Sequence, residues 1–225
     1  MLVLEIVFWV CAALLVWTQA GYAAALWLAG RVVPPRAEPR SDALPSVTLV
    51  VAAYAEAGVI GAKVANALAL DYPRDRLEII VACDGSPDAT ALLAREAGAD
   101  RVLELPRGGK IRAQDQAVEA ARGDVVAFSD ANALWEPDAL RRLVAPFADP
   151  VVGYVCGQVR FVNDEDGTNQ EGLYWRYEMW MRAMESRLAS VTGGNGAIYA
   201  TRRASYVVVD AVMGHDLSFP FTMVK

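Results

Sequence analysis

The sequence lacks the residue patterns of several common classes of protein. Its three cysteines, Cys11, Cys83 and Cys156, are far apart and form no CxxC pair, so we expect reduced structural thiols rather than disulfides or a zinc site. Basic residues are outnumbered 21 to 27 by acidic ones, and the net charge of -6 argues against electrostatic binding to nucleic acid. The composition therefore predicts no nucleic-acid partner.

The glycine patterns of two common nucleotide sites are also missing. A dinucleotide site needs GxGxxG between its first strand and helix, but residues 54–58 read YAEAG. A P-loop needs Ser or Thr after its lysine, but Ile111 follows Lys110, and Glu104 stands where the first glycine should be. These differences exclude a dinucleotide oxidoreductase and a P-loop enzyme.

The N-terminal segment is long and apolar. Residues 2–30 contain one charged residue, Glu5, and twenty helical residues already span ~30 Å, so we expect residues 1–32 to form a transmembrane helix. A cleaved signal peptide is the alternative, but the segment has no basic start and its apolar part is too long. Three arginines follow at once: Arg31, Arg36 and Arg40. The positive-inside rule then predicts a single-pass protein of the cell (inner) membrane with its remaining chain in the cytoplasm.

The rest of the chain reads as an α/β domain, residues 47–225, after a Pro-rich linker, residues 33–46. Unbroken apolar runs predict strands buried on both faces, and helical patterns follow them at short spacing. The predicted strands are residues 47–53, 77–83, 101–105, 124–129 and 151–162. The predicted helices are residues 57–70, 87–97, 111–121, 137–147 and 173–191. This alternation predicts a mostly parallel sheet flanked by helices.

Two of these helices carry further expectations. Ser86 is predicted to cap the helix at residues 87–97, with Pro87 at its first position. The helix at residues 173–191 has an apolar stripe that we expect in the core, and the alternative is a helix lying on the bilayer surface. The stripe consists of Leu173, Tyr177, Trp180, Met184 and Leu188.

Acidic residues fall at the ends of predicted strands. Glu56, Asp84 and Asp130 follow three of them, and Asp216 lies late in the chain. Carboxylates that face one sheet edge repel one another unless a cation or sugar hydroxyls take up the charge, so this edge is expected to bind a ligand. For Asp130 alone, metal binding and helix capping before Pro137 remain alternatives.

Four short motifs, in order, carry a resemblance to a known family. They are AYAE at residues 53–56, CDGS at 83–86, GK at 109–110 and SDAN at 129–132. In this order and spacing, the set resembles the family 2 glycosyltransferases with a GT-A fold. It is most similar to the membrane-bound branch that includes poly-N-acetylglucosamine, hyaluronan and cellulose synthases. The resemblance implies an enzyme of polysaccharide biosynthesis that moves a sugar from a nucleotide-diphosphate donor, with a lean to UDP, to a saccharide or lipid acceptor, using Mg²⁺ or Mn²⁺.

The resemblance also implies roles for individual residues. The donor nucleotide would be held by Ala53, Tyr54, Glu56, Asp84, Gly85, Ser86, Lys110 and Asp130. Asp130 would bind the metal together with Asn132, and Asp216 would be the catalytic base. One base without a nearby nucleophile predicts inversion at the anomeric carbon. The acceptor is expected near residues 158–196, and the candidates are Glu178, Gly194, Asn195 and Gly196.

Departures from the family pattern leave other hypotheses open. Asn132 replaces the last Asp of D-x-D, so weaker metal binding is expected, and residues 113–115 read AQD instead of A-L-N. His215, the one histidine, is expected on the surface, with a place in the site as the alternative. The chain stops at Lys225, before the Q-x-x-R-W motif of polymer-forming relatives, so the domain is expected to be C-terminally incomplete. A non-catalytic nucleotide-sugar-binding or scaffold protein and a nucleotidyltransferase are the alternatives.

Overall fold

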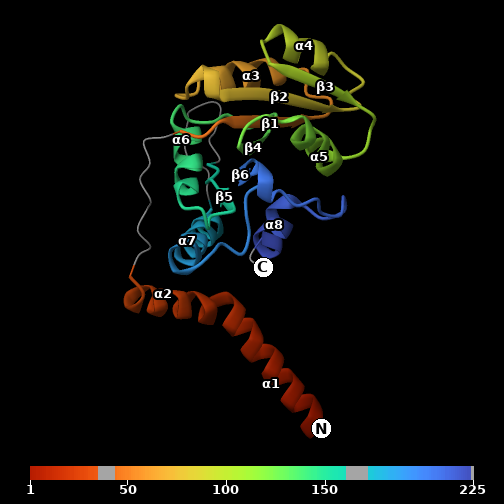
Figure 1. The fold of residues 1–225 in the computed structure, drawn as a ribbon. Helices are drawn as coiled ribbons and strands as arrows, with labels where there is room; N and C mark the ends of the chain where they lie inside the picture. The colour runs from red at the N-terminus through yellow and green to blue at the C-terminus, as the bar shows by residue number, and fades with distance from the viewer. Residues whose placement is uncertain (35–43, 161–171, 224–225) are drawn as a thin grey trace. The chain divides into compact units, whose positions relative to one another are not determined.

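The computed structural model describes residues 1–34, 44–160 and 172–223 (Figure 1). The chain divides into two compact units. One contains residues 1–37 and 160–192, and the other contains residues 38–159 and 193–225. The larger unit holds the predicted α/β sheet, and the smaller one holds the N-terminal apolar segment.

The described residues of the larger unit form a six-stranded sheet in the order β3-β2-β1-β4-β6-β5. The strands are β1 Val47–Ala53, β2 Leu77–Asp84, β3 Arg101–Leu105, β4 Val125–Asp130, β5 Tyr154–Cys156 and β6 Ile198–Arg202. The first four are parallel, whereas β6 runs antiparallel to β4 and β5 runs antiparallel to β6. The predicted α/β fold with a mostly parallel sheet is therefore confirmed.

The antiparallel edge differs from the prediction. The strand β6 was not predicted, and it lies between β4 and β5 although it comes last along the chain. The expected strand at residues 151–162 is reduced to the three residues of β5 within the part that the structure describes. Its length is limited because β5 pairs only with β6, whose partner residues run from Tyr199 to Thr201.

Helices cover both faces of the sheet (Figure 1). On one face the core is formed with α3 Ile60–Leu68, α4 Thr90–Glu96 and α6 Ala139–Val144. On the other face it is formed with α5 Lys110–Ala120 and α8 His215–Met223. Alternate residues of β1 serve the two cores, since Leu49 and Val51 join the first and Val50 joins the second. Both faces are buried, which explains the unbroken apolar runs of the strands.

The start of α4 is a correction to the sequence prediction. The helix begins at Thr90, and Ser86 makes no capping bond. Instead, the carboxylate of Asp88 accepts hydrogen bonds from the N–H and the hydroxyl of Thr90, at 3.1 and 2.5 Å. The Ser86 hydroxyl accepts a bond of 3.2 Å from the N–H of Ala55. Ser86 thus braces the turn after β1, because that turn is nearer to its hydroxyl than the helix is.

The smaller unit contains the apolar N-terminal helix. Its parts are α1 Leu2–Val16, the π-helical turn η1 Trp17–Gly21 and α2 Tyr22–Val32. The whole helix, 31 residues, is long and apolar enough to cross a membrane. Figure 1 shows it changing direction near η1, as π-turns commonly cause.

The helix α7 Leu173–Leu188 packs against α2 through polar contacts. The hydroxyl of Tyr22 donates to the carboxylate of Glu185 at 2.7 Å, and Glu185 is buried. The stripe expected in a core is exposed in part, since Leu173 is 82% exposed and Trp180 is 37% exposed. The core interpretation of this stripe is not confirmed, since none of its residues is buried and the buried residue of α7 is Glu185.

Candidate active site

The ends of three parallel strands meet at one edge of the sheet and enclose a cleft. Ala53 at the end of β1 pairs with Cys83 of β2, and Ala52 pairs with Asp130 of β4, so Asp84 and Asp130 flank the end of β1. The cleft has a volume of about 330 Å³. It is lined by Ala52, Ala53, Tyr54, Glu56, Asp84, Arg107, Lys110, Asp130, Ala131 and Asn132. Most of the residues expected at the donor and metal sites thus lie together.

The Asp84 carboxylate holds the loop before α5. It is 3% exposed and accepts hydrogen bonds from the N–H of Gly108 at 2.6 Å and of Gly109 at 3.0 Å. The Arg107 guanidinium pairs with it at 2.6 Å. Three donors therefore surround one buried carboxylate, which fixes the loop that begins α5. The negative charge of Asp84 is largely satisfied by protein groups, so its expected contact with the nucleotide would use only its remaining lone pairs.

Arg107 is a cleft residue that the sequence reasoning missed. Its guanidinium lies 3.4 Å from the centroid of the Tyr54 ring, and both residues line the cleft. The pair presents a flat cationic surface beside the acid at the end of β2. The signal in the sequence was Arg107 beside the Gly108-Gly109 turn that precedes Lys110.

Lys110 and Asp130 form the charged centre of the cleft. Lys110 is the first residue of α5, Asp130 is the last residue of β4, and their side chains pair at 2.5 Å. Both side chains are partly exposed, so an incoming anion or cation can reach them. Asn132 lies two residues beyond Asp130 and is exposed in the cleft. The helix-capping alternative for Asp130 does not hold, because α6 begins at Ala139.

The donor set suits a hard divalent cation that also binds a diphosphate. Asp130 offers a carboxylate and Asn132 an amide oxygen, and Mg²⁺ is commonly held by one or two carboxylates plus substrate phosphates. Among the described residues, no group of three His, Cys, Asp or Glu side chains could hold a metal alone. The cleft therefore fits the expected Mg²⁺ or Mn²⁺ site, in which the protein would supply some of the metal ligands and the phosphates of the donor would supply the others.

A buried lysine supports the loop that carries Asn132. Lys63 of α3 is fully buried, and its ammonium donates to the carbonyl of Ala133 at 2.5 Å. Asn66, one turn along α3, exchanges two bonds of 2.9 Å with the backbone of Trp135. Burial lowers the pKa of Lys63 to about 7, although the nearby Asp130 charge opposes this effect. Sequence reasoning missed both residues, although two polar residues three apart on an apolar helix were a signal.

The proposed base lies close to the charged pair. Asp216 is the second residue of α8, and its carbonyl accepts a bond of 2.6 Å from the N–H of Gly194. A Cβ atom at Gly196 would lie 3.7 Å from the Lys110 nitrogen and 4.0 Å from an Asp216 oxygen. A Cβ atom at Gly194 would overlap the Tyr154 hydroxyl, at 1.8 Å. The glycines of residues 193–196 therefore let the backbone pass between Asp216, Lys110 and the edge strand.

The remaining predicted residues have structural contacts. The carbonyl of Glu56 accepts bonds from Val59 and Ile60 at the start of α3, and its N–H donates to the Thr90 hydroxyl at 2.9 Å. Gly85 has a φ of +65°, which suits the turn after β2. The Asn195 side chain accepts a bond from Ala197 at 3.1 Å. Glu178 belongs to the smaller unit, where it pairs with Arg182 at 2.7 Å.

The single histidine differs from its prediction. His215, expected on the surface, is 2% exposed and lies between aromatic side chains of β4, β6 and α8. Burial and the Lys110 charge lower its pKa to about 4, while Asp216 opposes the shift. The ring is therefore neutral over the ordinary pH range.

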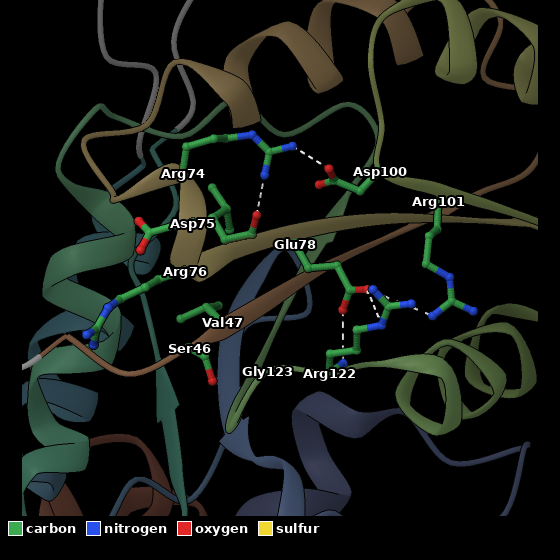
Figure 2. A pocket seen from close by; sticks show the side chains of 11 residues that line it. Ser46, Val47, Arg74, Asp75, Arg76, Glu78, Asp100, Arg101, Arg122 and Gly123 are labelled. Carbon is green, nitrogen blue, oxygen red and sulfur yellow. Dashed lines mark hydrogen bonds and ion pairs between the residues drawn. The ribbon is translucent and has the colours of Figure 1, made fainter.

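A second hollow lies at the opposite ends of the parallel strands, and Figure 2 shows its charged side chains. It is larger, about 590 Å³, but five of its charged side chains form ion pairs with one another. Arg74 forms an ion pair with Asp100, and Glu78 lies 3.8 Å from Arg101 and 3.9 Å from Arg122. We therefore assign the chemistry to the smaller cleft, where strand ends and partly exposed charges converge.

A family model described as glycosyl transferase family 2 matches residues 48–207, which include every lining residue of the smaller cleft. The chain belongs to glycosyl transferase family 2. Its resemblance in sequence and its GT-A fold are thereby confirmed, and it is a glycosyltransferase by family.

Relatives of this glycosyltransferase include enzymes with lipid and polysaccharide products. It is 34% identical over 211 residues to a beta-monoglucosyldiacylglycerol synthase of Synechocystis sp., and the match covers 87% of this chain and 43% of that protein. It is 34% identical over 127 residues to a poly-beta-1,6-N-acetyl-D-glucosamine synthase of Staphylococcus aureus, and the match covers 54% of this chain and 30% of that protein. The chain thus spans less than half the length of both relatives.

A solved structure is similar over nearly the whole glycosyltransferase chain. A mannosyltransferase from Pyrobaculum calidifontis, solved in complex with GDP-Man and Mn²⁺, matches with a TM-score of 0.76 and 29% identity. The match covers 95% of this chain and 62% of that one. A nucleotide-sugar donor and a divalent cation are therefore bound by a protein of the same fold.

Proposed function

We propose that this chain transfers a sugar from a nucleotide-diphosphate donor, bound with a divalent cation in the cleft at residues 52–132, to a saccharide or lipid hydroxyl. One observation carries the proposal: the ammonium of Lys110, which pairs with Asp130, and the carboxylate of Asp216 both lie near Gly196. The Lys110 ammonium and the Asp130 carboxylate, which would serve the diphosphate, thus lie in the same region as a carboxylate that can take a proton.

The chain's own residues can be given roles in this transfer. Tyr54 and Arg107 would contact the nucleoside, and Lys110 would offset the charge that develops on the leaving diphosphate. Asp216 would accept the proton of the acceptor hydroxyl as its oxygen attacks the anomeric carbon. A new C–O bond forms there while the bond to the diphosphate breaks, and the electron pair leaves with the nucleotide. Direct displacement of this kind inverts the anomeric carbon.

The cation would be held by Asp130 and Asn132. When bound, Mg²⁺ or Mn²⁺ supplies positive charge next to the leaving diphosphate oxygens. The Mn²⁺ in the similar mannosyltransferase supports this assignment. The uncharged Asn132 would make the site weaker than one with two carboxylates.

The N-terminal helix supports a membrane location. The helix Leu2–Val32 has the length and apolar composition of a transmembrane segment, and none of its most apolar stretch is buried. Arg31 lies at its end, while the other arginines of the predicted positive-inside signal, Arg36 and Arg40, lie outside the described residues. We infer a single-pass anchor with the catalytic unit in the cytoplasm, which the helix and Arg31 at its end support.

The test is calorimetric titration of the detergent-solubilised protein with UDP and with GDP, each with and without Mn²⁺. We expect Mn²⁺-dependent binding of one nucleotide by the wild type and its loss in Asp130→Ala. The matched control is Asp71→Ala, since Asp71 is an exposed acid that pairs with Arg141 at 2.9 Å and does not line the cleft. Equal loss in both variants, or no binding by the wild type, would reject the site.

Turnover of the matching nucleotide sugars separates the alternatives. Release of nucleoside diphosphate with an inverted product anomer in NMR spectra supports the proposed transfer, and a retained anomer contradicts the mechanism. Binding without release or transfer would favour the non-catalytic nucleotide-sugar-binding protein, to which Asn132 lends some support. Pyrophosphate release from a nucleoside triphosphate would instead indicate a nucleotidyltransferase.

A further inference from the structure

The residue before the proposed base anchors α8 to the sheet. His215 is the first residue of α8, and its ring stacks on Phe219 one turn later, with ring centroids 4.2 Å apart. The ring also meets Phe128 of β4 edge to face, at 6.0 Å. Asp216 follows directly, so any rotation of the first turn of α8 moves its carboxylate.

Both nitrogens of the His215 ring have a partner. The Nδ1 atom lies 2.8 Å from the hydroxyl of Tyr199, and the Nε2 atom lies 3.3 Å from the hydroxyl of Tyr206. The Tyr206 hydroxyl in turn donates to the carboxylate of Asp115 at 2.6 Å. The four side chains, Tyr199, His215, Tyr206 and Asp115, form a continuous series that we call the buried relay, in which Tyr199 and His215 are buried and Tyr206 and Asp115 are half-buried.

One arrangement of hydrogens satisfies the whole relay. A phenol has a single hydrogen, so Tyr206, which donates to Asp115, must accept from His215. The Nε2 atom then carries the hydrogen, and Nδ1 accepts the hydrogen bond of Tyr199. A charged ring would turn Nδ1 into a donor toward Tyr199, so the arrangement in which Tyr199 donates to Nδ1 belongs to the neutral ring.

The charges around the ring agree with this requirement. His215 is buried, and the charged groups that act on its ring are Lys110 and Asp216. Asp130 acts on Tyr199, and Glu119 acts on Asp115 at the other end of the relay. Burial and Lys110 favour the neutral ring, whereas Asp216 favours the charged one, and the pKa of His215 falls to about 4 as a net result.

The relay joins the two helices that carry the proposed chemistry. Asp115 lies on α5, which begins with Lys110, and His215 lies on α8, whose second residue is Asp216. On its other side Asp216 is fixed by the N–H of Gly194, which donates to its carbonyl at 2.6 Å. The relay therefore sets the spacing between the diphosphate contact and the base.

We propose that His215 is a positioning residue, and that the buried relay holds the Asp216 carboxylate near Gly196 at a set position relative to Lys110. This inference rests on the proposed function, in which Asp216 takes the acceptor's proton. It assigns no substrate contact to His215, whose ring is enclosed by protein.

Tyr206→Phe tests the relay with little change of shape. It removes the hydroxyl that bonds His215 and Asp115 but keeps the ring that meets Phe219 at 5.3 Å. Tyr72→Phe is the matched control, because Tyr72 is buried and its hydroxyl donates to the carbonyl of Pro45 at 2.6 Å, outside the cleft. Tyr72→Phe loses one hydrogen bond and Tyr206→Phe loses two, and both remove a phenol hydroxyl while keeping the ring, so the control shows what the loss of such a hydroxyl does away from the cleft.

The kinetic expectation is specific to the base. Tyr206→Phe should lower kcat by about 10- to 100-fold, since a misplacement of ~1 Å costs about 100-fold, with donor KM and nucleotide affinity unchanged. Tyr72→Phe should leave kcat unchanged. Asp115→Ala should lower kcat as well. Asp115→Asn keeps an oxygen that can accept from Tyr206, so its kcat should stay much closer to that of the wild type. Equal kcat values for the Tyr206 and Tyr72 variants would overturn the positioning role.

A second measurement does not depend on activity. Because the chain has one histidine, ¹⁵N-histidine labelling with a tag free of histidine gives the signals of His215 alone. We expect a protonated Nε2 and an unprotonated Nδ1 from pH 5.5 to 8 in the wild type, and a changed tautomer ratio in Tyr206→Phe. The opposite tautomer, or a charged ring at pH 6, would overturn the relay. If the wild type turns over no donor, the proposed function fails, and these signals alone decide whether the relay exists.

Discussion

The buried Lys63 makes the stability of this protein depend on pH in a predictable direction. Its ammonium is fully buried, with the Ala133 carbonyl as a partner and the Trp135 ring 5.0 Å away. Burial lowers the pKa from 10.5 to about 7, which corresponds to about 5 kcal/mol against the charged form. Below pH 7 the folded protein carries this penalty in full.

The sign follows from proton binding in the two states. The folded chain releases the Lys63 proton near pH 7, whereas the unfolded chain keeps it until its pKa of 10.5. Between these values the unfolded state binds more protons, so the free energy of unfolding rises with pH. From pH 7 to pH 9 the expected gain is about 2 kcal/mol, because the folded amine is already half deprotonated at pH 7.

Lys63→Met removes the titrating group and keeps a side chain of similar length. Urea unfolding in detergent without divalent metal, followed by tryptophan fluorescence at pH 7, 8 and 9, should show the rise in the wild type and lack it in the variant. The control is Asn66→Ala, which loses bonds to the same loop but removes no titrating group, so it should keep the slope at lower stability. A constant difference between wild type and Lys63→Met across this pH range would refute the reasoning.

Two further predictions concern the metal site and the glycine turn. Asn132→Asp adds a charged oxygen in the cleft and should tighten Mn²⁺ binding by about tenfold, measured by calorimetry; unchanged affinity would show that residue 132 is not a ligand. Gly194→Ala places a methyl group on the Tyr154 hydroxyl and should destabilise the protein by about 1–3 kcal/mol in thermal unfolding. Gly58→Ala, where no atom lies within 4 Å, is the control, and equal effects would contradict the overlap.

The gathering of carboxylates at one edge could be predicted because it depends on local patterns. The consecutive apolar residues of β1 predicted that strand, and the shorter strand at residues 101–105 was also predicted, both with the bounds that the structure has. Parallel strands end at the same edge, so acids placed just after them, such as Asp84 and Asp130, must meet there. The sequence motifs that resemble the family lie on these same strand ends, and the family match confirms that resemblance.

The partners of buried polar residues could not be predicted, because they come from distant parts of the chain. Lys63 bonds Ala133, Tyr206 bonds Asp115, and Tyr22 bonds Glu185. The residues beside them in the sequence do not name these partners, and a polar residue in a helical pattern usually faces solvent. This is why His215 was expected on the surface and the stripe of α7 in a core.

The sequence by itself determined the α/β class, the apolar N-terminal helix and the edge of the sheet where the charged residues gather, since each follows from the periodicity and spacing of neighbouring residues. Only the tertiary structure decided that β6 enters the sheet between β4 and β5, and that α8 brings Asp216 beside Lys110. Strand order and helix docking depend on contacts between residues far apart in the chain, which no local pattern contains.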